Sequence, residues 1–334
     1  MKKTTFFLLL CLLVALIIAA VSIGSTSIPI RAVWKVIWAK ISGSEIPEVW
    51  QNYERTIWIL RFPRVILSVL AGSALAICGA AFQSIFRNPI CDPYILGISS
   101  GASLGAAIAI ITGLNVFTFG IPGMALLSSL LTLLLVLSIS RMRGNKSVEI
   151  ILLAGIALNF LISAVITLLM VMHQESLEQI IFWTMGSFVY ATWLENALLF
   201  FILLVCSFFL FLNSKNLNLM QLGNETAQTS GVNVHKTTLS VLILSSLLIS
   251  FTVACCGVIG FIGLIIPHIV RLLFGNHNRT VFAFSLIFGA LFCLIADTIA
   301  RTVIAPAELP VGSITAIAGA PYFLFLLISQ KNRK

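Results

Sequence analysis

The sequence predicts an all-α polytopic membrane protein with about ten transmembrane helices. Only 9% of its 334 residues are charged and 59% are hydrophobic, whereas soluble domains carry about 25% charged residues. The mean hydropathy is +1.09. One transmembrane helix with its share of loop takes roughly 30 residues, so this length accommodates about ten. The composition excludes a soluble enzyme, a disordered chain and a nucleic-acid-binding module.

Ten apolar runs predict the spanning helices. They cover residues 4–24, 63–82, 94–113, 119–140, 148–172, 193–212, 237–256, 258–274, 280–303 and 312–329. The first run is longer than the apolar part of a secretory signal, which is about 7–15 residues. We therefore expect it to stay as an uncleaved helix. The eighth run is short and interrupted by glycine and proline.

The basic residues predict the orientation. If the N-terminus is cytoplasmic, the short outer loops 114–118 and 173–192 hold no Lys or Arg. The cytoplasmic segments then hold Lys2, Lys3, Arg87, Arg141, Arg143, Lys146, Lys215, Lys236, Arg271, Arg279, Lys331, Arg333 and Lys334. Cytoplasmic loops are enriched in Lys and Arg. We expect both termini in the cytoplasm, which agrees with an even number of spans.

Two long hydrophilic breaks interrupt the apolar runs. The outer break, 25–62, carries Trp34, Trp38, Trp50 and Trp58, which is typical of an amphipathic segment at the membrane interface. The inner break, 213–236, is too polar to span. It has helical character between Gly223 and Gly231, so we expect a short cytoplasmic helix there.

The chain is expected to form one transmembrane domain, 1–334, from two repeats of about 1–175 and 176–334. A spacing echo supports duplication, although a glycine-rich chain can produce it by chance. Gly79, Pro89 and Gly97 recur 178 residues later as Gly257, Pro267 and Gly275. Five spans is an odd number, so the second repeat would be inverted in the membrane, as in many transporters.

Motifs for ATP binding and for metal binding are absent from the sequence. It has no Gly-x4-Gly-Lys-Ser/Thr phosphate-binding loop, and its seven cysteines have no metal-ligand spacing. We predict no enzyme activity, no resident cofactor and no metal. Asp297 is the clearest charge within an apolar run, whereas proton-coupled carriers usually hold several. The driving energy is therefore expected to come from another subunit.

Small residues mark two candidate parts of a passage. Gly97, Gly101 and Gly105 lie on one helix face, where they either allow close helix packing or form a smooth wall for a bulky solute. The second part is a helix break at Gly257, Gly260, Gly263 and Pro267. Non-helical backbone inside a membrane survives only when it is buried in protein or lines a cavity.

Charged motifs lie at the outer helix ends. Asp297 and Arg301 are four residues apart and can form an ion pair. Arg61 and Arg64 flank a proline, where they either anchor a helix at the interface or present guanidinium groups to the carboxylates of a docking protein.

At these motifs the chain resembles the FecCD-type permeases, the membrane subunits of ABC importers for iron–siderophores, haem and vitamin B12. The resemblance covers essentially 1–330. The matching stretches are Arg61–Arg64, Arg87–Pro89, Asp92–Gly97, Gly260–His268, Ala296–Arg301 and Glu308–Gly312. It implies the type II importer fold, with ten spans in inverted repeats. The implied partners are a second permease copy, identical or related, two cytoplasmic ATPases that bind ATP and Mg²⁺, and an outer binding protein.

The resemblance also implies roles for individual residues. Those matching the cytoplasmic coupling segment are Leu222, Gly223, Glu225, Ala227 and Gly231, and those matching the outer docking site are Arg61, Arg64 and Arg301. The chain departs from the family pattern at Ser230, where Leu is usual, and at His277–Arg279, where Asp-His-Arg is usual.

The expected function is ATP-driven import of an iron–siderophore complex across the bacterial inner membrane by alternating access. The same architecture could carry haem, vitamin B12 or an oxyanion such as molybdate. An ion-gradient-driven carrier is the remote alternative.

Overall fold

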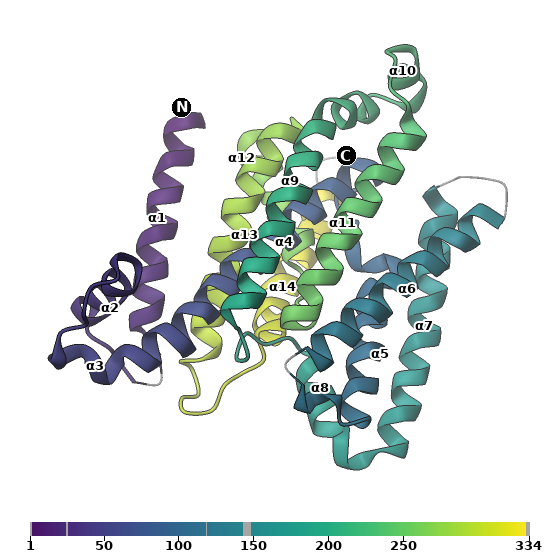
Figure 1. The fold of residues 1–334 in the computed structure, drawn as a ribbon. Coiled ribbons are helices and arrows are strands. Elements are labelled where there is room, and N and C mark those ends of the chain that lie inside the picture. Colours follow the sequence, from purple (N-terminus) through teal and green to yellow (C-terminus); the bar gives the residue numbers. More distant parts are fainter. Residues whose placement is uncertain (1, 25, 118, 143–147, 332–334) are drawn as a thin grey trace.

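The computed structural model describes residues 2–24, 26–117, 119–142 and 148–331, and they form a bundle of helices (Figure 1). The long helices are α1 (Lys2–Ser22), α4 (Phe62–Phe86), α6 (Gly120–Met142), α7 (Val148–Met172), α9 (Trp193–Gln221), α11 (Val234–Cys256), α13 (Asn278–Ala300) and α14 (Val311–Lys331). The shorter ones are α2 (Ile30–Ser42), α3 (Glu48–Arg55), α5 (Ile98–Ile111), α8 (Leu177–Thr184), α10 (Asn224–Thr229) and α12 (Ile262–Phe274). The predicted all-helical membrane fold is confirmed.

The ten predicted runs correspond to ten apolar helices. In the described ranges, seven helices are long and apolar enough to cross a membrane. Three shorter apolar stretches complete the set: α5, α12 and the Val311–Phe325 part of α14. Helix α5 has 14 residues and α12 has 13. At 1.5 Å per residue each is about 20 Å long, shorter than the roughly 30 Å hydrocarbon core. Each follows a segment of irregular backbone, 87–97 or 257–261.

Helix α4 lies at the centre of the bundle. It packs against α9, α11, α12 and α13, and most of its side chains are buried. Glycine permits the closest crossing. A Cβ atom at Gly72 would lie 2.2 Å from the carbonyl oxygen of Gly289 in α13. A Cβ atom at Gly289 would likewise lie 2.2 Å from the carbonyl oxygen of Gly72. Small residues at helix contacts let the two backbones approach closely.

The helix contacts repeat between the two halves of the chain. Helix α4 of the first half packs on α13 of the second, and correspondingly α11 of the second half packs on α6 of the first. Within each half, α5 packs on α6 and α12 packs on α13. The spacing echo in the sequence does not mark equivalent positions, however. Pro89 lies in the α4–α5 connection, whereas Pro267 lies inside α12.

The outer break forms the amphipathic helix that its tryptophans predict. In α2, Ala32, Val33 and Val36 are buried, and they belong to a cluster with residues of α1. On the other face, Trp34 and Trp38 are 53% and 58% exposed, and their rings stack at 6.3 Å.

Candidate functional site

The helices place candidate functional residues at two opposite ends of the bundle. We call these the α10 end and the α8 end, after the short helix at each (Figure 1). The start of α1 and the last turn of α14 lie toward the α10 end, whereas α2, α3 and the α13–α14 loop lie toward the α8 end.

The predicted short helix of the inner break is present as α10, between α9 and α11. Two glycines turn the chain around it, Gly223 with φ +131° and Gly231 with φ +86°. These backbone conformations suit glycine because it has no Cβ atom. The Val232 N–H donates to the carbonyl of Ala227 at 2.9 Å and closes the turn.

The five residues predicted for the coupling segment divide by exposure. Leu222 is 71% exposed, and Glu225 is also exposed. Ala227 is fully buried beneath α10, while Gly223 and Gly231 shape the turns. Of these five residues, only Leu222 and Glu225 present a side chain that a partner could contact.

A polar network behind α10 was missed by the sequence analysis. Its centre is Asn278, at the start of α13. The Asn278 N–H donates to Asn218 Oδ1 at 2.9 Å, and Ser84 Oγ donates to Asn278 Oδ1 at 2.6 Å. Arg271 Nη2 donates to Ser84 Oγ at 2.8 Å. Amide and hydroxyl groups far apart in the sequence thus connect the ends of α4, α9 and α12 to α13. The turn that departs from the family pattern supplies Asn278 to this network.

The helix break lies at 257–261, and α12 continues through Pro267. The expectation that Pro267 helps break the helix is therefore wrong. A proline inside a helix removes one N–H and leaves the carbonyl four residues earlier without its usual donor. Here that carbonyl belongs to Gly263, and Gln83 Nε2 donates to it at 3.4 Å and to Leu264 O at 3.0 Å. The Gln83 side chain supports the helix at this position.

The two irregular segments meet inside the bundle. Tyr94, in the 87–97 segment, donates its hydroxyl to the carbonyl of Ile259 at 3.1 Å. Gly257 ends α11 with φ +70°, and Gly260 has open space around its Cα. The break is therefore packed against the 87–97 segment on one side and lines a cavity at Gly257, the two settings in which irregular backbone survives in a membrane.

The glycines at the start of α5 are packed against neighbouring helices. Gly97 begins α5 with φ +79°. A Cβ atom at Gly101 would lie 2.3 Å from Thr132 Oγ1, and one at Gly105 would lie 2.2 Å from Met124 O. Within the chain, Gly101 and Gly105 therefore allow α5 and α6 to approach closely. Of the two roles considered for these glycines, helix packing and a smooth wall for a solute, this is helix packing.

Arg64 connects two carboxylates at the α8 end. Its Nε and Nη2 atoms donate to Asp297 Oδ1 at 3.0 and 2.9 Å, and Nη1 donates to Glu308 Oε2 at 2.8 Å. The predicted pair of Asp297 and Arg301 is present at 3.6 Å. The shorter contacts of Asp297 are to Arg64, 233 residues away in sequence.

The other two predicted docking arginines bind backbone carbonyls of the N-terminal segment. Arg61 Nη1 donates to Val21 O and Ser22 O, both at 3.1 Å, and Arg301 Nη2 donates to Ala20 O. Arg61, Arg64 and Arg301 are only 7%, 7% and 5% exposed. All three guanidinium groups therefore lie inside the chain and hold α1, α4 and α13 together.

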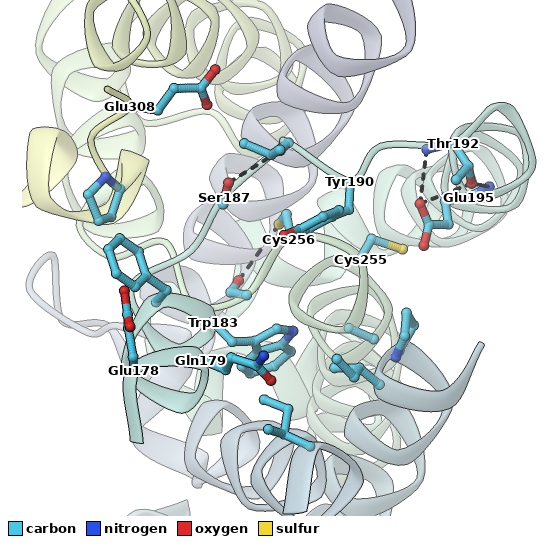
Figure 2. Close-up of a pocket in the computed structure, with 18 of the residues that line it drawn as sticks. Glu178, Gln179, Trp183, Ser187, Tyr190, Thr192, Glu195, Cys255, Cys256 and Glu308 are labelled. Atoms are coloured by element: carbon cyan, nitrogen blue, oxygen red, sulfur yellow. Dashed lines mark hydrogen bonds between the residues drawn. The ribbon is translucent and has the colours of Figure 1, made fainter. Parts of the chain in front are cut away.

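A cavity of about 850 Å³ opens at the α8 end (Figure 2). Its walls come from the end of α5, residues 116, 117, 121 and 122, α8, the α8–α9 connection, the end of α11 and the α13–α14 loop. Trp183 and Tyr190 contribute aromatic rings, and Glu178, Glu195 and Glu308 contribute carboxylates. Of the predicted passage residues, Gly257 lines this cavity.

Metal-ligating side chains do not gather in the described ranges. Among those residues, no group of three His, Cys, Asp or Glu side chains could hold a metal ion. All seven cysteines are free thiols.

Comparison with known proteins identifies the family. The FecCD transport family matches residues 12–329. The chain is 40% identical over 318 residues to the uncharacterized ABC transporter permease protein YvrB of Bacillus subtilis, covering 94% of this chain and 90% of the relative. It is 38% identical over 336 residues to the hemin transport system permease protein HmuU of Yersinia pestis, covering 98% and 96%. Other relatives are named as molybdate and vitamin B12 import permeases.

A solved structure shares the fold over almost the whole chain. It is described as an inward-facing conformation of a proposed metal-chelate type ABC transporter. The TM-score is 0.84 at 33% identity, with 98% of this chain and 99% of the other covered. Such permeases work with separate ATPase subunits and a binding protein. The chain belongs to the FecCD transport family and is a permease subunit of an ABC importer, without an ATPase of its own.

Proposed function

We propose that this chain forms the membrane passage of an importer of ferric siderophores, located in the bacterial inner membrane. The carrying observation is the cavity at the α8 end. Its volume of about 850 Å³ lies within the roughly 300–1,000 Å³ of sites for drug-sized organic molecules. A bulky organic chelate suits this space better than a small oxyanion does. The similarity to a metal-chelate type transporter supports the same choice.

Haem is the second candidate cargo, because a relative 38% identical over nearly the full length is named for hemin transport. The test is uptake in a strain that lacks this chain, supplied in parallel with radiolabelled ferric siderophores, haem, vitamin B12 and molybdate. We expect ferric siderophore uptake to be lost and to return with the wild-type chain. Loss confined to haem, vitamin B12 or molybdate would reassign the cargo.

The assembly proposed for the chain is a dimer with an identical or related permease, two cytoplasmic ATPases and an outer binding protein. Both termini and α10 lie in the cytoplasm in this arrangement, which agrees with their position at one end of the bundle (Figure 1). The ATPases bind ATP and Mg²⁺. Their closure moves α10, and the polar network at Asn278 connects this movement to α4, α12 and α13.

Leu222 is proposed as the main ATPase contact, because it is a large apolar side chain that is 71% exposed beside α10. Replacing Leu222 by Asp is expected to abolish ATP-driven uptake while leaving the fold intact. Val49→Asp is the matched control, since Val49 is 72% exposed in α3 at the opposite end. Normal uptake by the Leu222 variant would remove this residue from the contact.

Arg61, Arg64 and Arg301 are proposed as binding-protein residues from the family resemblance. Because they are buried, direct docking requires Arg64 to leave Glu308. Glu308→Gln weakens that pair and retains Asp297 as a partner. Docking through Arg64 predicts a tighter complex of this variant with the binding protein. An unchanged affinity, measured by titration at several salt concentrations, would assign the arginines an internal role alone.

A further inference from the structure

The cavity at the α8 end has an uneven distribution of charge. Three carboxylates reach it from separate elements: Glu178 from α8, Glu195 from the first turn of α9 and Glu308 from the α13–α14 loop (Figure 2). Among the described residues that line it, none is Lys, Arg or His. The lining therefore carries acidic charge with no basic side chain interspersed.

Only one of the three carboxylates has a basic partner. Glu308 pairs with Arg64 behind the cavity wall at 2.8 Å. Glu178 and Glu195 form no ion pair with any described residue. Their charges face the cavity uncompensated, so they dominate its electrostatic character.

Glu195 is held in position and keeps one oxygen free. The residue is buried, with only 7% of its surface exposed. The N–H and the hydroxyl of Thr192 both donate to Glu195 Oε2 at 3.0 Å. The Glu195 N–H donates back to Thr192 Oγ1 at 3.2 Å, which completes a capping box at the start of α9. Oε1 accepts no hydrogen bond from a described residue. This oxygen is not among the fully buried polar atoms that lack a partner, so it is open to a hydrogen-bond donor that a ligand in the cavity supplies.

Aromatic rings complete the cavity between the carboxylates. Trp183 comes from α8, as Glu178 does, and Tyr190 lies between Glu308 and Glu195 in the view of Figure 2. Ring faces attract cations through their quadrupole, and carboxylates attract cations and repel anions. Both features disfavour an anionic cargo. Specific binding sites often reject a wrong ligand by such unfavourable interactions.

We propose that this cavity is a cargo subsite that accepts cationic or neutral metal chelates and rejects anionic ones, with Glu178 and Glu195 as its selecting residues. The proposal rests on the proposed import of ferric chelates and specifies their charge class. A chelate with a protonated amine would donate to Glu195 Oε1. Tris-catecholate complexes, haem with its two propionates, and oxyanions are unfavourable in the same place.

The test uses the complete importer in proteoliposomes with its own ATPase and binding protein. The probes are radiolabelled ferric complexes of desferrioxamine B, which is cationic, of a neutral trihydroxamate and of an anionic tris-catecholate. We measure the ratio of cationic to neutral uptake for wild type, Glu178→Gln, Glu195→Gln and the double variant. Because the cationic complex loses its charged hydrogen-bond acceptors and the neutral complex does not, we expect the double variant to lower the ratio by roughly tenfold, which is about 1.4 kcal/mol.

Glu175→Gln is the matched control, because Glu175 lies three residues from Glu178, is exposed, and does not line the cavity. It should leave the ratio unchanged. Glu178 is also exposed, so Glu178→Gln tests the proposal even if Glu195→Gln fails to fold. An unchanged ratio in folded variants, or preferred uptake of the anionic complex by wild type, would overturn the charge assignment. Failure of wild type to transport any ferric chelate would overturn the proposed function itself.

Discussion

Arg64 and Asp297 form a buried ion pair that joins α4 to α13 at the α8 end. The guanidinium donates to Asp297 Oδ1 from two nitrogen atoms, at 3.0 and 2.9 Å. The Asp297 residue is fully buried. A carboxylate in such a place is tolerated because a cation and its hydrogen bonds accompany it. The pair explains why a charge can occur within the apolar run at 280–303.

Removing Arg64 is expected to destabilise the protein strongly. Breaking one side of a buried ion pair costs about 3–5 kcal/mol, because the remaining charge stays buried. Arg64→Gln should therefore lower the apparent melting temperature in detergent and reduce the yield of folded protein. The surface pair of Lys40 and Glu54, whose side chains are 35% and 38% exposed, gives the control, since Lys40→Gln should change stability by no more than about 1 kcal/mol. Equal effects of the two variants would contradict this account.

The contact of Gly72 with Gly289 is expected to tolerate no side chain. A Cβ at either position would meet the other backbone at 2.2 Å, so Gly72→Ala must separate α4 from α13. Overpacking of this kind costs about 1–3 kcal/mol. Gly123→Ala, in α6 with nothing within 4 Å of its Cβ, should be neutral or stabilising because alanine favours helices. Thermal unfolding of both variants measures the difference.

Gln83 and Pro267 are expected to be energetically coupled. Gln83→Leu leaves the Gly263 carbonyl without the donor that replaces the missing proline N–H, at a cost of about 1–3 kcal/mol. In a Pro267→Ala background the alanine N–H is available to this carbonyl. The loss caused by Gln83→Leu should then shrink by at least about 0.5 kcal/mol in a double-mutant cycle. Strict additivity would sink the proposed link.

Asp92 is expected to make stability depend on pH. It lies in the connection between α4 and α5, and burial raises the pKa of its carboxyl from 3.8 to about 6, although the Tyr94 N–H opposes this shift. The folded state therefore holds the proton more tightly than the unfolded state. Its contribution to stability is full below about pH 4 and is lost as the pH rises through about 6.

Asp92→Asn removes this titration and keeps an oxygen for the Tyr94 N–H, which donates to Asp92 Oδ1 at 2.8 Å. Melting temperatures measured from about pH 4 to about pH 7 should fall more steeply for wild type than for the variant. Parallel curves would show that Asp92 does not titrate in this range.

The local helices of this protein follow directly from its sequence. Apolar runs long enough to span a bilayer have few structural alternatives, because backbone N–H and C=O groups must be paired within the segment. A different local signal predicted α10: the stretch 213–236 is too polar to span, and Gly223 and Gly231 permit the turns that flank a short helix. The tryptophans of 25–62 likewise predicted an amphipathic helix.

Contacts between distant segments were decided only by the tertiary structure. The sequence paired Asp297 with Arg301 because they are four residues apart, but it could not reveal Arg64 as the closer partner. It placed Arg61, Arg64 and Arg301 at an outer surface, whereas their guanidinium groups turn inward to carboxylates and carbonyls. It also treated Pro267 as a helix breaker, whereas Gln83 from α4 supports the helix there. Helices are specified by neighbours along the chain, while a buried charge or a freed carbonyl finds its partner only when the helices pack together.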